Sequence, residues 1–292
     1  MGPLLNVKQA YEARSGKNKK FMISLLKTII LAVFAICFML PLLWMFSSSL
    51  KGPTEVFGYP MKWIPKTIRW SNYVKVWTDP DIPFLRLYYN SLFIVIFSII
   101  GCLLTSSLAG YAFAKMDFAG KDILFMLLLA TMMIPSQVTI IPRFMLFKMI
   151  GLYNTHWALI LPSWFSVTAI FLLRQTYHSL PNELIDAAVI DGCSHRIIWL
   201  RVLLPLTKPA LVSLMVLQFI SGWNEYLSAI VFLLDKSLYT VSQGVQYYYA
   251  SEAQEFNFTM AAATSAVIPI IILFISAQKY FIEGIASSGM KE

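Results

Sequence analysis

The chain has 292 residues, of which 58% are hydrophobic and 13% are charged, and its formal net charge is +8. Soluble globular domains carry about 25% charged residues, so the composition excludes an ordinary soluble domain and is typical of a membrane protein. The positive balance does not indicate nucleic-acid binding, because the sequence contains no compact basic patch with interleaved aromatic residues.

Residues 1–20 form a polar, basic tail, followed by the apolar run Thr28–Leu50. This run is too long for the apolar region of a signal peptide, which spans about 7–15 residues, and no clear cleavage site follows it. We therefore expect a retained membrane anchor. Because basic residues flanking a span favour the cytoplasmic side, the tail is predicted to be cytoplasmic.

Six apolar segments are long enough to cross a bilayer, which requires about 20 mostly apolar residues. Five of them contain no Asp, Glu, Lys or Arg, and the sixth contains only Glu225. The segments lack the alternation of barrel strands, so helices are expected. The predicted spans are Thr28–Leu50, Leu87–Ala114, Ile123–Pro142, Met149–Leu173, Pro209–Leu234 and Asn257–Gln278.

The predicted fold class is thus an all-α, polytopic integral membrane protein with six transmembrane helices. One transmembrane domain covers residues 21–292, and an even number of spans returns the C-terminus to the cytoplasm. The loop 51–86 is rich in Pro and Trp and is expected to lie along the outer membrane surface, since Trp favours the interface.

Two spans carry features that bear on packing. The second ends in small residues over 106–114, which predicts a close contact with another helix. The third contains Pro135 and Gln137. Polar groups and a proline at membrane depth indicate either a kinked wall facing a cavity or a kink packed inside the bundle, and the sequence leaves both open.

The most informative segment is the polar loop at about 181–205, which lies between spans. Pro181 suits the first turn of a helix, and acidic residues follow where the helix dipole favours them. Ala187 and Ala188 are small, so a partner surface could approach the backbone. Gly192 permits an unusual turn. An amphipathic helix on the lipid surface is the alternative, but the spacing D-A-A-x-x-D-G favours a docking surface.

The sequence contains no phosphate-binding loop, no H-E-x-x-H motif and no Cys/His metal spacing. Cys37, Cys102 and Cys193 imply no disulfide framework. We therefore expect no catalytic residues, no metal site and no cofactor bound by this chain.

The loop resembles the "EAA" loop of the inner-membrane permease subunits of ABC importers. The motifs AGYAFAK at 109–115, GLYNT at 151–155 and WNEYL at 223–227 are similar to the MalG-type subunit of the carbohydrate-uptake class. The chain departs from the family pattern at Asp186, where Glu is usual, and at Cys193, where Ala is usual. Neither change removes charge or adds much bulk.

The resemblance implies a subunit of an ATP-driven importer in the bacterial cytoplasmic (inner) membrane, with both termini cytoplasmic. Its partners would be a second, MalF-like permease subunit, two ATP-binding subunits that hold ATP and Mg, an extracytoplasmic solute-binding protein, membrane lipid and an oligosaccharide, with no nucleic acid. The loop would couple to an ATPase through Glu183, Asp186, Ala187, Ala188, Asp191, Gly192 and Pro205.

Five residues are candidates for the substrate pathway: Gln137, Arg143, Trp223, Asn224 and Glu225. An ionisable residue within a span is a functional hypothesis by default, but Glu225 could equally form a structural pair. Arg143, with Lys148, could attract an acidic oligosaccharide, or the two could extend to the lipid interface. The other functions considered are an ABC permease for phosphate, peptide or polyamine, and a secondary transporter driven by an ion gradient.

Overall fold

The computed structural model describes the backbone of residues 2–250 and 255–289 and the side chains of residues 21–250 and 255–279. Every regular element in these residues is helical. The main helices are α1 (Gly2–Ser49), α2 (Ser71–Thr78), α3 (Phe84–Lys115), α4 (Lys121–Ala130), α5 (Ile140–Met149), α6 (Trp157–Ser163), α7 (Val167–His178), α8 (Glu183–Ile190), α11 (Lys208–Trp223), α12 (Leu227–Phe232), α13 (Val241–Tyr249) and α14 (Phe256–Gly289).

Helix α3 lies at the centre of the bundle and packs against α6, α7, α11 and α13. Its predicted contact through small residues is confirmed. A Cβ atom added at Gly110 would lie 3.0 Å from Leu173 Cβ and 3.1 Å from Arg174 N, so α3 and α7 approach backbone to backbone there. Close approach of this kind is how helices associate in lipid, where the hydrophobic effect supplies little attraction between them.

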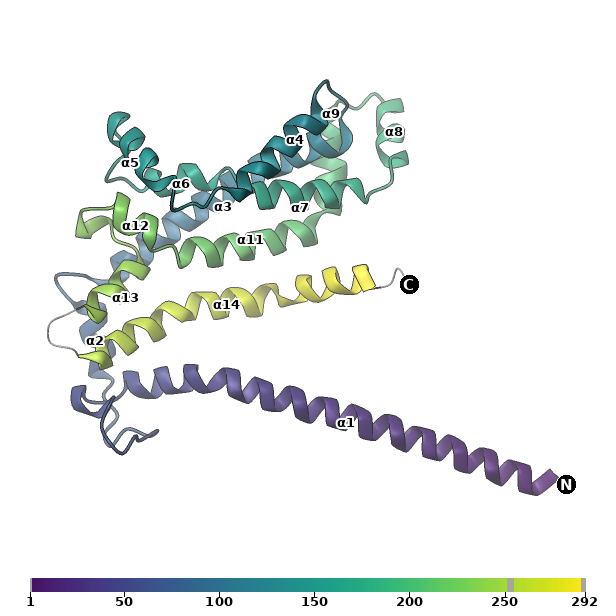
Figure 1. Ribbon diagram of the computed structural model, residues 1–292, viewed down its shortest axis with the longest axis horizontal. Coiled ribbons are helices and arrows are strands. Elements are labelled where there is room, and N and C mark those ends of the chain that lie inside the picture. The colour runs from purple at the N-terminus through teal and green to yellow at the C-terminus, as the bar shows by residue number, and fades with distance from the viewer. Residues whose placement is uncertain (1, 251–254, 290–292) are drawn as a thin grey trace.

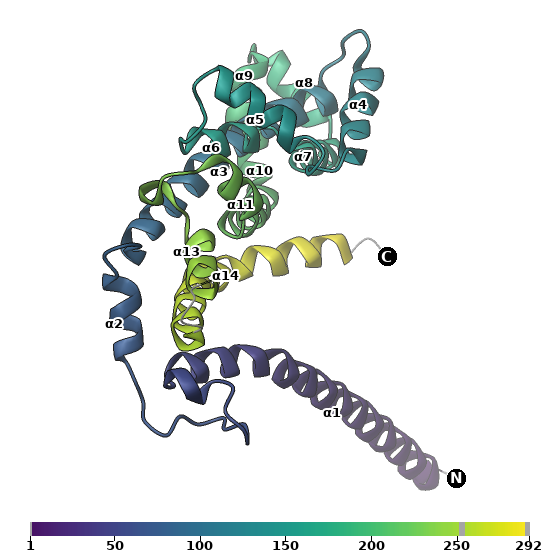
Figure 2. The same cartoon turned by 60° about the vertical axis from the view of Figure 1, so that its left-hand side comes forward.

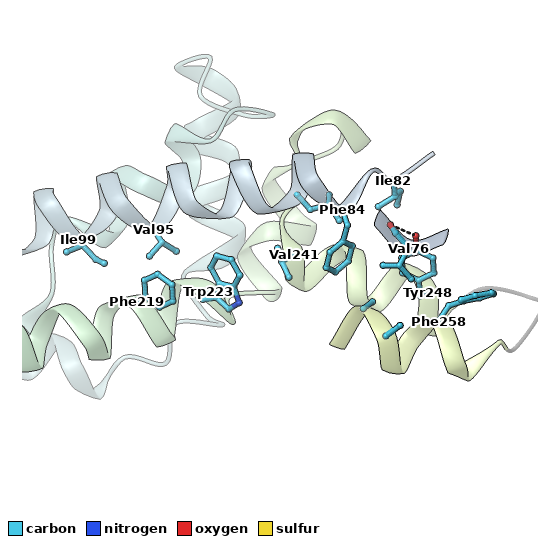
Figure 3. Packing of buried hydrophobic residues seen from close by; sticks show 13 residues of the cluster. Val76, Ile82, Phe84, Val95, Ile99, Phe219, Trp223, Val241, Tyr248 and Phe258 are labelled. Carbon is cyan, nitrogen blue, oxygen red and sulfur yellow. Dashed lines mark hydrogen bonds between the residues drawn. The ribbon is translucent and has the colours of Figure 1, made fainter. Parts of the chain in front are cut away.

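The largest buried cluster joins α2, α3, α11, α13 and α14 (Figure 3). Phe219 and Trp223 stack with ring centroids 5.4 Å apart, and Tyr88 meets Trp223 edge-on at 5.5 Å. The indole Nε1 of Trp223 donates to the carbonyl of Ala266 at 2.9 Å. The cluster fixes α14 against α3 and α11.

Helix α1 packs only near its C-terminal end, alongside α14, and then diverges from the other helices (Figures 1 and 2). Its side chains from Phe21 to Leu42 are all exposed, so they are free for lipid or for another subunit. The Gly2 end of α1, the Gly289 end of α14 and helix α8 lie toward one end of the molecule, and α2, α5 and α13 lie toward the other (Figure 1).

The loop after α1 folds back along the end of that helix. Trp63 meets Trp44 edge-on with ring centroids 5.2 Å apart, and Ser47 Oγ donates to the Trp63 carbonyl. Lys51 Nζ donates to the Lys62 carbonyl at 2.6 Å and lies 3.7 Å from the Trp44 ring. The loop therefore carries Trp63 back to the level of the last turns of α1.

The six predicted spans are not all continuous helices, and the count of six is not confirmed. Among the described residues, four helices are long and apolar enough to cross a membrane, or up to five if one bent pair counts as a span. The predicted third span is broken: α4 is only 10 residues long, and α5 begins after a gap. Pro135 explains the break, since it lacks an N–H and forces Ile134 into an extended conformation (φ −85°, ψ 114°).

The bent pair begins in the second half of the predicted docking loop, residues 181–205, and continues into α11. The helical segment His195–Leu206 meets Lys208–Trp223 at an angle of 79°. The middle of the segment His195–Leu206, residues Ile198–Leu203, is π-helical. Pro205 lies within the short helix α10 (Leu204–Leu206), and the bend follows at Thr207, between α10 and α11. The predicted sequence of helix, glycine turn and second helix is thus present.

Candidate functional site

Helix α8 presents a mixed acidic and apolar face to solvent. Glu183, Asp186, Ala187 and Asp191 are exposed, and Ile190 is 85% exposed. Acidic residues lie in the first turn, where the helix dipole favours negative charge. Such a surface, apolar and charged together, is suited to a protein partner.

One predicted docking residue faces inward. Ala188 is buried, together with Ile185, in a cluster that contains Tyr177, Ile198 and Leu203. Its small side chain therefore allows α8 to pack closely on its own chain, and the expectation that Ala188 offers a bare backbone to a partner is corrected. Gly192 and Pro205 are exposed.

The turn after α8 is a Schellman cap. Gly192 adopts φ +76°, its N–H donates to the Val189 carbonyl at 2.9 Å, and the Cys193 N–H donates to the Ala188 carbonyl at 2.9 Å. These two bonds satisfy carbonyls that a helix end would otherwise leave unpaired. Glycine is favoured because the left-handed conformation is strained for other residues.

Two latches tie the docking loop to α3. Lys115 Nζ donates to the Leu180 carbonyl at 2.8 Å and to Asn182 Oδ1 at 2.5 Å, just before α8. Tyr111 Oη bonds His195 Nδ1 at 2.7 Å, just after the glycine turn. The segment that contains α8 is therefore bonded to α3 on both sides of that helix. Sequence reasoning missed these residues, although Tyr111 and Lys115 both lie in the AGYAFAK motif.

A cavity of about 260 Å³ lies among α3, α5, α6, α11 and α12. Arg143 and Glu225, two of the predicted pathway residues, both line it. Polar residues supply much of the remaining wall: Ser98, Ser163, Ser166, Gln218, Ser221 and Ser228. The convergence of these hydroxyls could not be predicted from the sequence, because the serines come from four separate segments.

The other three pathway candidates do not line this cavity. Trp223 is buried in the core, and Asn224 donates to the Ile220 carbonyl at 2.8 Å on its own helix. Both border a separate hollow among α11, α13 and α14. Gln137 is exposed in the break between α4 and α5. Because residues 131–139 are exposed, the kink packed inside the bundle is wrong for this chain, and the cavity-facing wall stays a prediction.

Residues 101–287 match the family described as "Binding-protein-dependent transport system inner membrane component". The "Arabinooligosaccharides transport system permease protein AraQ" of Halalkalibacterium halodurans is 34% identical over 272 residues, which cover 92% of this chain and 97% of that protein.

The chain belongs to this family of ABC importer permeases. It is accordingly a multi-pass transport subunit of the inner membrane and not an enzyme. Membership implies a partner permease, an ATPase and a solute-binding protein.

A second relative, the "sn-glycerol-3-phosphate transport system permease protein UgpE" of Yersinia enterocolitica, is 32% identical over 267 residues, or 89% of this chain and 95% of that permease. Among solved structures, a bacterial ABC transporter involved in the import of the acidic polysaccharide alginate aligns with a TM-score of 0.78. It is 24% identical and covers 89% of this chain and 96% of that chain. This match supports the permease fold alone.

Proposed function

We propose that the chain forms one half of the transmembrane pathway of an ATP-driven importer for a sugar or oligosaccharide. The family supports the import role, and the relative named for arabinooligosaccharide transport supports the class of cargo. The second half would be a MalF-like permease subunit. The chain itself would bind no cofactor, since ATP and Mg belong to the partner subunits.

The observation that carries the coupling role is the exposed face of α8 on a loop latched to α3. We infer that Glu183, Asp186, Ala187 and Asp191 contact an ATP-binding subunit, with Gly192 setting the turn. Pro205, which starts the return to the membrane, would help to set the bend. Because the residues before and after α8 bond to α3, movement of the ATPase subunits would be transmitted to the bundle.

The orientation that we propose follows from this coupling role. Helix α8 must lie in the cytoplasm to meet an ATPase, and the Gly2 and Gly289 ends lie toward the same end of the molecule (Figure 1). Both termini would then be cytoplasmic, in agreement with the basic N-terminal tail. Residues of α2, α5 and α13 would face the solute-binding protein.

A phosphate-bearing solute is a second candidate, because one relative is named for sn-glycerol-3-phosphate transport. Both candidates require ATP. The test is uptake into proteoliposomes that contain the whole complex, with radiolabelled oligosaccharides and sn-glycerol 3-phosphate as probes. We expect uptake that requires internal ATP, is blocked by vanadate and is unaffected by ionophores. Uptake abolished by ionophores but insensitive to vanadate would instead support the ion-coupled transporter.

A further inference from the structure

We propose that the cavity beside Arg143 and Glu225 selects an uncharged, hydroxyl-rich portion of the cargo and disfavours carboxylates, phosphates and amines. The inference rests on the proposed import function and adds the charge of the cargo to it. Its basis is the arrangement of one cation and one anion on the same cavity wall.

The two charges are held in place by a shared neighbour. Arg143 Nη2 donates to Ser228 Oγ at 3.0 Å, and the Ser228 backbone N–H donates to Glu225 Oε1 at 2.7 Å. The guanidinium also lies over the Phe232 ring, 4.8 Å from its centroid. These contacts fix Arg143 on α5 and Glu225 before α12.

Arg143 and Glu225 do not form a direct ion pair. In the part of the chain that the structure describes, the salt bridges within 4.0 Å join Lys75 to Glu255 and Lys121 to Asp117. A guanidinium has five N–H donors and a carboxylate about four acceptor positions, so each group keeps bonding capacity beyond its contacts with Ser228. The wall therefore offers both donors and acceptors, with a net charge near zero.

The hydrogen-bonding capacity and charge of the cargo's functional groups determine which of them can bind to this wall. A hydroxyl both donates and accepts, so it can bond to either charge and to the surrounding serines and Gln218. An ionised carboxylate or phosphate only accepts, and it would meet Glu225. An ammonium only donates, and it would meet Arg143. The opposite charges of the wall largely cancel, so neither kind of ion gains a net attraction that offsets the cost of removing it from water, and both kinds are disfavoured.

The volume of the cavity and one apolar residue in its wall agree with a sugar. Its volume of about 260 Å³ lies just below the range of about 300–1,000 Å³ for pockets that enclose a whole small ligand, so it suits a short portion of a longer cargo. Phe165 lines the cavity and is 61% exposed. Its ring offers an apolar face beside the polar wall, which is the combination expected at a small-molecule site.

The experiment compares uptake of matched neutral oligosaccharides and their uronate counterparts by the whole importer in proteoliposomes. The wild type and every variant use the same solute-binding protein. The preference of that protein for neutral or acidic sugars therefore cancels when the neutral-to-acidic uptake ratio of a variant is compared with that of the wild type. Glu225→Gln keeps the oxygen that accepts from Ser228 and removes the charge. We expect it to narrow the neutral-to-acidic ratio by about tenfold, which corresponds to about 1.4 kcal/mol. Arg143→Gln should widen the ratio.

Opposite shifts in one ratio cannot come from poor folding, because less folded protein lowers both uptake rates in parallel. The matched control is Gln246→Glu, which places a carboxylate at the separate hollow among α11, α13 and α14 and should leave the ratio unchanged. An unchanged ratio in Glu225→Gln, or a wild-type preference for uronates, would overturn the inference while leaving the import function intact. Absence of ATP-dependent uptake for every carbohydrate would count against the proposed function itself.

Discussion

Replacing Gly192 tests whether the turn after α8 sets the docking geometry. Gly192 has φ +76°, and a Cβ atom added there would meet nothing within 4 Å. Gly192→Ala therefore introduces backbone strain without a clash inside the chain. The left-handed conformation costs an L-residue about 1–2 kcal/mol, which lowers the population of the native turn by a factor of about 5–30.

The assay is the affinity of the purified permease complex for its ATP-binding subunits, together with cargo-stimulated ATP hydrolysis. We expect Gly192→Ala to weaken both by a factor within that range. Gly192→Asn is larger but tolerates the left-handed conformation better, so it should be less damaging than Ala. If Asn is as damaging as Ala or worse, bulk at the partner surface and not backbone strain is responsible, and the reasoning fails.

The matched control is Gly151→Ala. Gly151 has φ +75° and equally open space around its Cβ position, but it lies in the turn between α5 and α6, away from α8. The strain should be similar, so the two variants should lose similar stability. Only Gly192→Ala should lose affinity for the ATPase. Equal losses of affinity in both variants would show that the effect is one of general stability.

Three further outcomes are expected. Lys115→Met removes the bonds that hold the start of the docking loop, so the complex should hydrolyse more ATP per cargo molecule while assembling normally; an unchanged ratio in proteoliposomes would contradict the latch. Gly110→Leu would overpack the contact with Leu173 and should cost about 1–3 kcal/mol, seen as a lower unfolding temperature in detergent, and a temperature equal to the wild type's would refute the close approach. With the native cysteines removed, Tyr59→Cys should react with an impermeant thiol reagent in intact cells and Asp117→Cys only after permeabilisation, whereas the opposite pattern would invert the proposed topology.

The docking loop was predictable because its signals are local. Acidic residues, two alanines and a glycine follow one another at helix-and-turn spacing, and the structure has α8 and a Schellman cap at those positions. The direction in which Ala188 points was not predictable. That direction depends on which face of α8 meets Tyr177 and Ile198, and these contacts come from other segments.

The positions of the apolar spans could be predicted from composition, but whether each span is one unbroken helix could not. Hydropathy located the apolar segments, but it cannot report where a proline breaks a helix completely, as at Pro135. The cavity depended on tertiary structure altogether. Arg143 and Glu225 are 82 positions apart (225 − 143), and their common contact with Ser228 arises from the packing of α5 beside α12.

Cross-linking from α8 in the assembled complex would show whether this chain couples to an ATPase through the exposed face of that helix. A photoreactive group would be attached to a cysteine replacing Ala187, which is exposed, with Asp117→Cys as the control outside the docking loop. If α8 couples to an ATPase, a cross-link should form from position 187 to an ATP-binding subunit and none from position 117. Labelling of lipid alone from position 187 would contradict this coupling and would place α8 on the membrane surface.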